Sequence, residues 1–149
     1  MMEVFGNLWV MEADYRCITT NGTVKRNGEA VMGRGVALQA AKMDKGLAAR
    51  LGASIKAHGN HVRPIAFNLT CQPELLIAFP VKHYWWERAD LALIERSANE
   101  LAEFAAQRPN KTFLLPRPGC GNGGLLWDDV REVLEPILPP HVWVVERPR

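Results

Sequence analysis

The residues Leu75-Leu76-Ile77-Ala78-Phe79 form a short run that is apolar at every position. Phe113-Leu114-Leu115 forms a second such run. A strand with one solvent face alternates apolar and polar residues, whereas a strand covered on both faces is apolar throughout. The two runs therefore predict central strands of a sheet that carries helices on both of its faces.

Other short apolar segments extend this sheet. The complete set of predicted strands is Met2–Phe5, Tyr15–Thr19, Val62–Asn68, Leu75–Phe79, Thr112–Pro116 and Val142–Glu146. Helical periodicity is clearest between Asp90, the expected N-cap, and Gln107, because apolar residues recur there every three or four positions. Further helices are predicted after Gly33 through Ala41, over Gly46 to His58, and from Trp127 to Pro136. Alternating strands and helices predict a mixed α/β sandwich.

The chain has 149 residues, which predicts one domain over residues 1–149. Apolar residues make up 48% and charged residues 23%, the balance of a soluble globular protein. No apolar run approaches the roughly 20 residues of a membrane span, and the first nine residues lack the basic cluster of a secretory signal. We therefore expect a cytoplasmic monomer. The net charge of +2 does not favour a broad nucleic-acid-binding surface, so any such binding is expected to be local.

The potential metal ligands are few and scattered. Cys17, Cys71 and Cys120 are odd in number and widely spaced, which fits neither a disulfide framework nor the paired cysteines of a zinc site. His58 and His61 share one stretch, but no third ligand lies at a suitable spacing. We expect a reduced protein with no metal and no cofactor.

Two glycine-rich segments lie where loops are predicted to enter helices. They are Val31-Met32-Gly33-Arg34-Gly35-Val36-Ala37 and Pro118-Gly119-Cys120-Gly121-Asn122-Gly123-Gly124-Leu125. Glycines allow close approach of a ligand to the backbone, and free N–H groups at a helix start favour phosphate. Neither segment has the spacing of a P-loop or a Rossmann fingerprint. Either one alone is typical of a tight turn, whereas the two together favour a site for two phosphates.

Four segments in this order resemble the macrodomain family. They are Gly6-Asn7-Leu8, the stretch from Gly33 to Gln39, Phe79-Pro80-Val81-Lys82-His83-Tyr84-Trp85, and the loop from Pro118 to Leu125. The resemblance is greatest to the branch that contains terminal ADP-ribose protein glycohydrolase and the DNA ADP-ribosyl glycohydrolase antitoxins of the DarG type. It implies a three-layer α/β/α macrodomain with a mixed central sheet and an ADP-ribose cleft at the carboxyl edge of that sheet.

The resemblance also implies which residues bind ADP-ribose as the ligand. Asn7 matches the position where many relatives use an aspartate to recognise adenine, and the two glycine loops match those that enclose the diphosphate and the distal ribose. The implied ADP-ribose-binding residues are Asn7, Leu8, Asn21, Met32, Gly33, Arg34, Gly35, Val36, Pro118, Gly119, Cys120, Gly121, Asn122, Gly123, Gly124 and Leu125.

The chain departs from the family pattern in two places. Residues 20–30 are longer than the short asparagine-rich connection of many relatives, so Asn21 either lies near the distal ribose or forms a turn before Gly22. The second glycine loop has Asn122, Gly123 and Gly124 where the protein glycohydrolase has an aspartate. The antitoxin branch lacks that aspartate too.

Lys82 is the candidate catalytic residue. It follows an apolar strand and precedes His83, Tyr84, Trp85 and Trp86, so we expect it to be partly withdrawn from water and able to act as a nucleophile or base. In the relatives the matching lysine acts at the anomeric carbon of the distal ribose. The aromatic residues after it are expected either to pack in the core or to stack on a nucleobase.

These observations lead to two hypotheses. The first is an ADP-ribosyl glycohydrolase that removes ADP-ribose from a modified macromolecule, either a nucleobase in DNA or RNA or an acidic side chain of a protein. The second is a non-catalytic module that only binds ADP-ribose. Lys82 favours the enzyme, because a binding module needs the glycine loops but no lysine at the anomeric centre.

Overall fold

The computed structural model describes residues 1–69 and 72–148, so Cys71 lies outside the described residues. In this part of the chain six strands form one sheet in the order β1-β6-β5-β2-β4-β3. The strands are β1 (Met2–Phe5), β2 (Tyr15–Asn21), β3 (Arg63–Leu69), β4 (Gln72–Lys82), β5 (Phe113–Pro116) and β6 (Val142–Glu146). Neighbouring strands are parallel except β3 and β4, which pair antiparallel. The predicted mixed sheet is confirmed.

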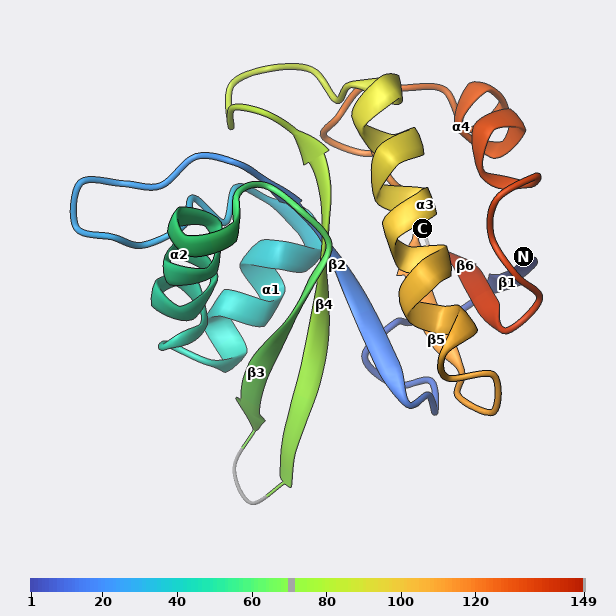
Figure 1. Ribbon diagram of the computed structural model, residues 1–149, viewed down its shortest axis with the longest axis horizontal. Coiled ribbons are helices and arrows are strands. Elements are labelled where there is room, and N and C mark those ends of the chain that lie inside the picture. Colours follow the sequence, from blue (N-terminus) through green and yellow to red (C-terminus); the bar gives the residue numbers. More distant parts are fainter. Residues whose placement is uncertain (70–71, 149) are drawn as a thin grey trace.

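Four described helices cover the two faces of this sheet. They are α1 (Gly35–Met43), α2 (Leu47–His58), α3 (Leu91–Ala106) and α4 (Trp127–Leu134). Helices α1 and α2 lie on one face and α3 and α4 on the other (Figure 1). The result is the predicted three-layer α/β/α arrangement. None of the described helices has the length and apolar character of a membrane span.

Successive residues of the central strands are buried in different halves of the core. Cys17 and Ile77 belong to the cluster under α3 and α4, whereas their neighbours Ile18 and Leu76 belong to the cluster under α1 and α2. All four are fully buried. This two-sided burial is why the strands are apolar at every position, because consecutive strand side chains point to opposite faces.

The prediction of complete burial is wrong at Leu75, which is 43% exposed. Leu75 is paired with Ala66 of the edge strand β3, toward the amino end of β4. Leu76, Ile77, Ala78 and Phe79 follow toward the middle of the strand and are almost fully buried. The apolar run is therefore longer than the stretch that both helical layers cover.

The predicted cap of α3 is confirmed. The Asp90 carboxylate accepts a hydrogen bond from the Ala92 N–H at 3.0 Å, which satisfies one of the donors left free at a helix start. Its other oxygen contacts Nε2 of His83 at 2.8 Å. These bonds fix the start of α3 to the segment that follows β4.

Candidate active site

The carboxyl ends of the five parallel strands meet at one edge of the sheet. Asn21 and Lys82 are paired across β2 and β4 at this edge, with a local irregularity in register just before them. Phe5 of β1 pairs with Glu146 of β6 in the same way. Both glycine loops begin or end here, because one precedes α1 and the other follows β5. Ligands of open α/β sheets bind at this position, since loops from several strands converge there.

A cleft of about 2340 Å³ follows this edge. Most of the predicted site residues line it: Asn7, Leu8, Asn21, Met32, Gly33, Arg34, Gly35, Val36, Lys82, Gly119, Cys120, Gly121, Asn122, Gly123 and Gly124. Pro118 and Leu125 do not line it. Pro118 is buried, and Leu125 packs against the core under α3. The volume exceeds the several hundred cubic ångströms of an ordinary small-molecule pocket, so the cleft suits an extended ligand.

The second glycine loop offers unused backbone donors. Within the described residues, the N–H groups of Cys120, Gly121, Asn122 and Gly123 donate to no protein acceptor. The Gly33 and Arg34 N–H groups at the start of α1 are also without a partner in this part of the chain. Free backbone N–H groups at a helix start or in a glycine-rich loop are suited to bind phosphate oxygens.

The charge of the cleft suits an anionic ligand. Seven basic and three acidic residues line it, although the whole chain carries a net charge of only +2. The basic residues are Lys25, Arg34, Lys45, Lys82, Arg88, Arg117 and Arg147, and the acidic ones are Glu29, Glu87 and Glu146. Positive charge concentrated in a cleft attracts phosphates and raises their local concentration.

The backbone around Lys82 is held by four hydrogen bonds from three segments: α3 with its N-cap, the loop before β3 and the loop after β2. The carbonyl oxygens of residues 80–83 accept in turn from Oγ of Ser97 at 2.7 Å, the Asp90 N–H at 2.9 Å, Nδ2 of Asn60 at 3.0 Å and the Gly22 N–H at 3.1 Å. Lys82 therefore sits on a fixed backbone at the end of β4. Its half-buried side chain donates from Nζ to the Trp85 carbonyl at 3.4 Å.

Asn21 takes the turn-forming role that was one of its two predicted alternatives. Its Oδ1 accepts from the Thr23 N–H at 3.0 Å and its Nδ2 donates to the Val31 carbonyl at 2.9 Å. The side chain is only 7% exposed. Asn21 thus ties both ends of the loop of residues 22–31, and it does so on the wall of the cleft beside Lys82.

The loop of residues 22–31 is ordered by its own bonds and by α2. Val24 and Ala30 form an antiparallel bridge, and the Ala30 N–H donates to the Ala48 carbonyl at 2.8 Å. Gly52 of α2 makes this contact possible, because a Cβ there would lie 2.0 Å from the Gly28 carbonyl oxygen. The additional length of this segment therefore forms one wall of the cleft.

Asn7 follows β1, which forms one edge of the sheet, so it lies at the opposite end of the cleft from β4. Its Oδ1 accepts from the Trp9 N–H at 2.9 Å, which leaves one lone pair and the amide NH₂ for a ligand. Nε of Arg16 donates to the Leu8 carbonyl at 2.8 Å and anchors this loop to β2. Sequence reasoning missed Trp9 and Gln39, which line the cleft and are joined by a hydrogen bond of 2.9 Å.

Cys120 is not activated. Burial raises the pKa of its thiol to about 11, so it is protonated at neutral pH. Cys17 is buried under α3, and burial likewise raises the pKa of its thiol. Both are free thiols.

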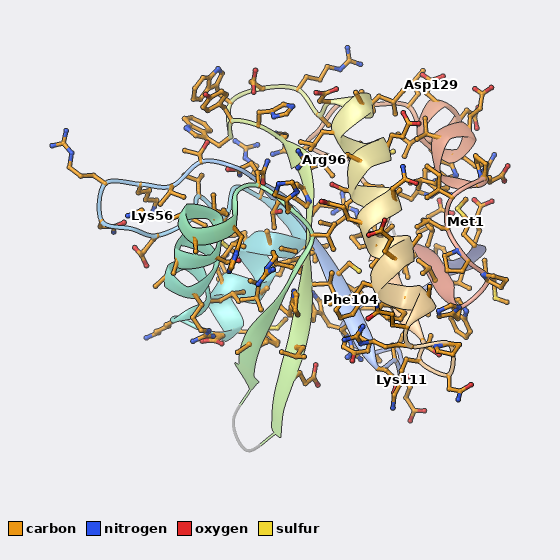
Figure 2. All side chains as sticks on the ribbon, in the orientation of Figure 1. Met1, Lys56, Arg96, Phe104, Lys111 and Asp129 are labelled. Carbon is orange, nitrogen blue, oxygen red and sulfur yellow. The ribbon has the colours of Figure 1, made fainter. Side chains whose placement is uncertain are left out.

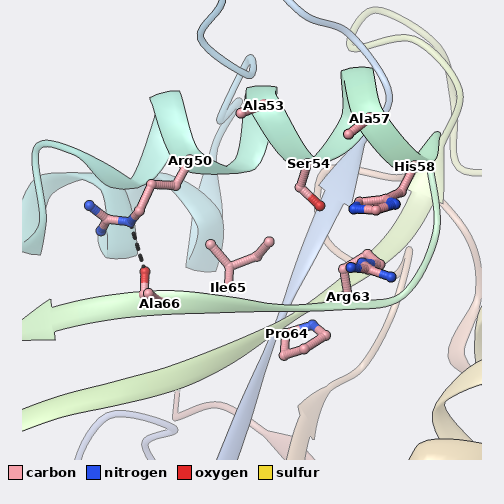
Figure 3. Close-up of a pocket in the computed structure, with 9 residues that line it drawn as sticks. All are labelled: Arg50, Ala53, Ser54, Ala57, His58, Arg63, Pro64, Ile65 and Ala66. Atoms are coloured by element: carbon pink, nitrogen blue, oxygen red, sulfur yellow. Dashed lines mark hydrogen bonds between the residues drawn. The ribbon is translucent and has the colours of Figure 1, made fainter.

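Among the described residues, no group of three His, Cys, Asp or Glu side chains could hold a metal ion. Nδ1 of His61 contacts Oε2 of Glu100 at 2.6 Å. His58 lines a smaller hollow of about 340 Å³ between α2 and β3 (Figure 3). That hollow shares no lining residue with the cleft, and Arg50 beside it donates to the Ala66 carbonyl.

Comparisons with known proteins agree with this architecture. No family model matches the chain. The chain is 32% identical to a DNA ADP-ribosyl glycohydrolase of Thermus aquaticus over 79 residues, which are 50% of this chain and 22% of that protein. The matched part is thus about a fifth of that relative.

Solved structures match over nearly the whole chain. The macrodomain of Mycobacterium tuberculosis DarG is 25% identical with a TM-score of 0.75, covering 99% of this chain and 98% of that one. The macrodomain of Thermus aquaticus DarG is 26% identical with a TM-score of 0.75, covering 97% of each chain. Thermosipho africanus DarTG in complex with ADP-ribose shares the fold, with 19% identity and a TM-score of 0.77 over 99% of this chain and 42% of that one. The chain therefore has the macrodomain fold and is similar, over nearly its whole length, to the macrodomains of DarG.

Proposed function

We propose that this chain hydrolyses the bond between ADP-ribose and a base of DNA. One observation carries the proposal: Lys82 lies on the wall of the same cleft as both glycine loops. A module that only binds ADP-ribose needs the loops but no amine in the same cleft. The relatives named DNA ADP-ribosyl glycohydrolase and DarG support DNA as the acceptor.

In this proposal the ligand lies along the carboxyl edge of the sheet. The diphosphate accepts hydrogen bonds from the free N–H groups of residues 33–34 and 120–123. The adenine lies toward Asn7 and Leu8, and the distal ribose lies toward Asn21 and Lys82. The six basic residues of the cleft other than Lys82 stabilise the two phosphate charges.

Lys82 acts at the anomeric carbon of the distal ribose by one of two routes. As a nucleophile, Nζ forms a bond to that carbon while the bond to the base breaks, and the base leaves with the electron pair and takes a proton. Water then cleaves the lysyl bond, releasing ADP-ribose and the free amine. As a cation, Nζ stabilises the negative charge that develops on the leaving base while water attacks the carbon directly. Substitution by arginine separates these routes, because a guanidinium keeps its charge but is not a nucleophile.

We also infer that residues 1–149 form one macrodomain that acts as a monomer in the cytoplasm. Both routes use only Lys82 and water, and we expect no metal and no cofactor to take part.

The direct test follows release of ADP-ribose from ADP-ribosylated DNA, with ADP-ribosylated RNA and protein as parallel substrates. Release from DNA at a rate at least about tenfold above that from the other two supports the proposal. Release from protein alone would reassign the acceptor. If none of the three substrates released ADP-ribose while free ADP-ribose still bound, the chain would be a binding module.

Lys82→Ala is expected to reduce turnover by about a hundredfold or more while leaving the affinity for free ADP-ribose within a few-fold, because the contact is made chiefly in the transition state. Single-turnover kinetics and calorimetry measure the two quantities. Lys82→Arg with activity near that of the parent would exclude the covalent route.

Lys111→Ala is the matched control. Lys111 is exposed, contacts Asp14, and lies near the start of β5 at the other end of the sheet from the cleft (Figure 2). The Lys111→Ala variant should leave turnover unchanged. Full activity of Lys82→Ala would remove Lys82 from the mechanism.

A further inference from the structure

Three large aromatic side chains are exposed together beside the cleft. Tyr84, Trp85 and Trp86 are 51%, 53% and 64% exposed, so packing in the core, one of their two predicted alternatives, does not occur. They lie in the loop between β4 and α3, at the same end of the sheet as Lys82 (Figure 1). We call these three residues the aromatic lip.

The rings of the lip are arranged against one another. Tyr84 and Trp86 are stacked, with ring centroids 4.8 Å apart and planes inclined by 20°. Trp85 stands edge-on to Trp86 at 6.1 Å and 86°. Aromatic pairs in these geometries attract each other, so the faces that remain open are presented in a fixed orientation.

The backbone of the lip is equally fixed. The Tyr84 N–H donates to Oε1 of Glu87 at 3.0 Å, and the Glu87 N–H donates back to the Tyr84 carbonyl at 3.1 Å. The Trp85 N–H donates to Oγ1 of Thr23 at 3.1 Å, which joins the lip to the loop of residues 22–31. A platform ordered in advance loses little entropy when a ligand binds to it.

Two cations, Lys82 and Arg88, and one carboxylate, Glu87, line the cleft beside the lip. The two tryptophans of the lip line it as well. In the described part of the chain neither cation forms an ion pair, and Arg88 instead donates to the Gly124 carbonyl at 2.6 Å. Exposed aromatic faces next to unpaired cations are the combination that binds single-stranded nucleic acid, because bases stack on the rings and phosphates meet the cations.

We propose that the aromatic lip binds unmodified bases that neighbour the ADP-ribosylated nucleotide in single-stranded DNA. This inference rests on the proposed function, since the lip then holds the strand while its modified base enters the cleft beside Lys82. Bases in a duplex are stacked on one another and paired, so their faces cannot reach the rings. The lip therefore selects single strands over duplexes and has affinity for DNA that carries no ADP-ribose.

The test uses a fluorescein-labelled, unmodified single-stranded oligonucleotide of about ten nucleotides and measures fluorescence anisotropy at low salt. The single strand should bind at least about tenfold more tightly than the same sequence as a duplex. Trp86→Leu should weaken binding by about tenfold or more, and Trp86→Phe should remain within about threefold of the parent, because stacking needs an aromatic face. Leu75→Ala, which alters an exposed apolar residue at the far end of β4, should change nothing.

Several outcomes would overturn the inference. Equal binding of duplex and single strand, or unchanged binding by Trp86→Leu, would show that bases do not stack on the lip. Displacement of the oligonucleotide by saturating free ADP-ribose would place the DNA in the glycine loops rather than on the lip. Self-association of the parent protein that Trp86→Leu abolishes would make the lip an interface between two copies.

The two proposals fail separately. An oligonucleotide that does not bind, together with release of ADP-ribose from modified DNA, would refute the lip and keep the hydrolase. Tight binding of the unmodified strand without release of ADP-ribose from modified DNA would keep the lip and refute the hydrolase.

Discussion

A side chain added at Gly121 would project into open space, whereas one added at Gly123 would collide with neighbouring protein atoms. A Cβ at Gly121 has no atom within 4 Å, whereas one at Gly123 would lie 2.6 Å from the Gly119 carbonyl oxygen and 2.7 Å from Cβ of Ala89. The glycines of one loop therefore have different roles. Gly123 allows the loop to pack against the start of α3, and Gly121 leaves the cleft open.

Gly121→Val should consequently fold normally but bind ADP-ribose at least about tenfold more weakly, because a branched side chain would stand where the diphosphate approaches the backbone. Calorimetry with ADP-ribose measures the loss. Unchanged affinity in a variant with the parent's melting temperature would show that this loop does not hold the diphosphate.

Gly123→Ala provides the contrast. Its Cβ collides with backbone, which cannot move as a flexible side chain can, so the variant should lose about 1–3 kcal/mol of unfolding free energy. Urea denaturation measures this loss. A stable Gly123→Ala would contradict the packing role assigned to Gly123.

At the scale of elements, the start of α3 and the end of β4 stabilise each other. Asp90 caps α3 through its carboxylate, contacts His83 through the other oxygen, and donates its own N–H to Val81. The hydrogen bond from His83, followed by that from the Ala92 N–H, lowers the pKa of Asp90 below its usual value. Burial of the carboxylate raises its pKa, but this effect is smaller than that of the hydrogen bond from His83.

Asp90→Ala should therefore lose about 1 kcal/mol of unfolding free energy at pH 7. Because the pKa of Asp90 is lower in the folded protein than in the unfolded chain, its charge stabilises the fold above about pH 4 and ceases to do so as the pH falls through the folded-state pKa. Urea titrations between pH 7 and pH 3 measure the difference between parent and variant. The difference should shrink below about pH 4.

Asp90→Asn separates the cap from the charge. Asparagine caps helices about as well as aspartate, so this variant should be more stable than Asp90→Ala at every pH. A difference between parent and Asp90→Asn that stays constant from pH 7 to pH 3 would argue against a contribution from the ionised carboxylate.

At the scale of the whole molecule, the cleft is built from segments that span most of the chain, from Gly6 to Pro148. A ligand that joins them can bind only the folded protein, which shifts the unfolding equilibrium. Free ADP-ribose at a hundred times its dissociation constant should add about 2.7 kcal/mol of stability, which raises the melting temperature of a domain of this size by about 5–10 °C.

Differential scanning calorimetry measures this shift. Lys82→Ala should show it in full, since Lys82 is assigned to turnover and not to binding. An unchanged melting temperature at millimolar ADP-ribose would contradict the assignment of the cleft.

The sequence alone determined the elements of this protein and the segments that carry its site. Within the described residues each of the six strands and four helices overlaps a predicted segment, because a period of two or of about three and a half residues is a property of neighbouring positions. Strand β4 (Gln72–Lys82) extends three residues beyond the predicted Leu75–Phe79 at each end. The two glycine loops and Lys82 were likewise recognised from short motifs. Their chemistry depends on residue types that adjoin one another in the chain.

Only the tertiary structure decided how these pieces meet. The order of the strands, and with it the pairing of Asn21 with Lys82, depends on contacts between residues 61 positions apart. The different surroundings of Gly121 and Gly123 also depend on a distant residue, because Ala89 lies against Gly123 and not against Gly121. The sequence did not determine whether Tyr84, Trp85 and Trp86 are exposed, because an aromatic residue is suited both to a core and to a surface. Whether such a ring is covered depends on which distant segments pack against it.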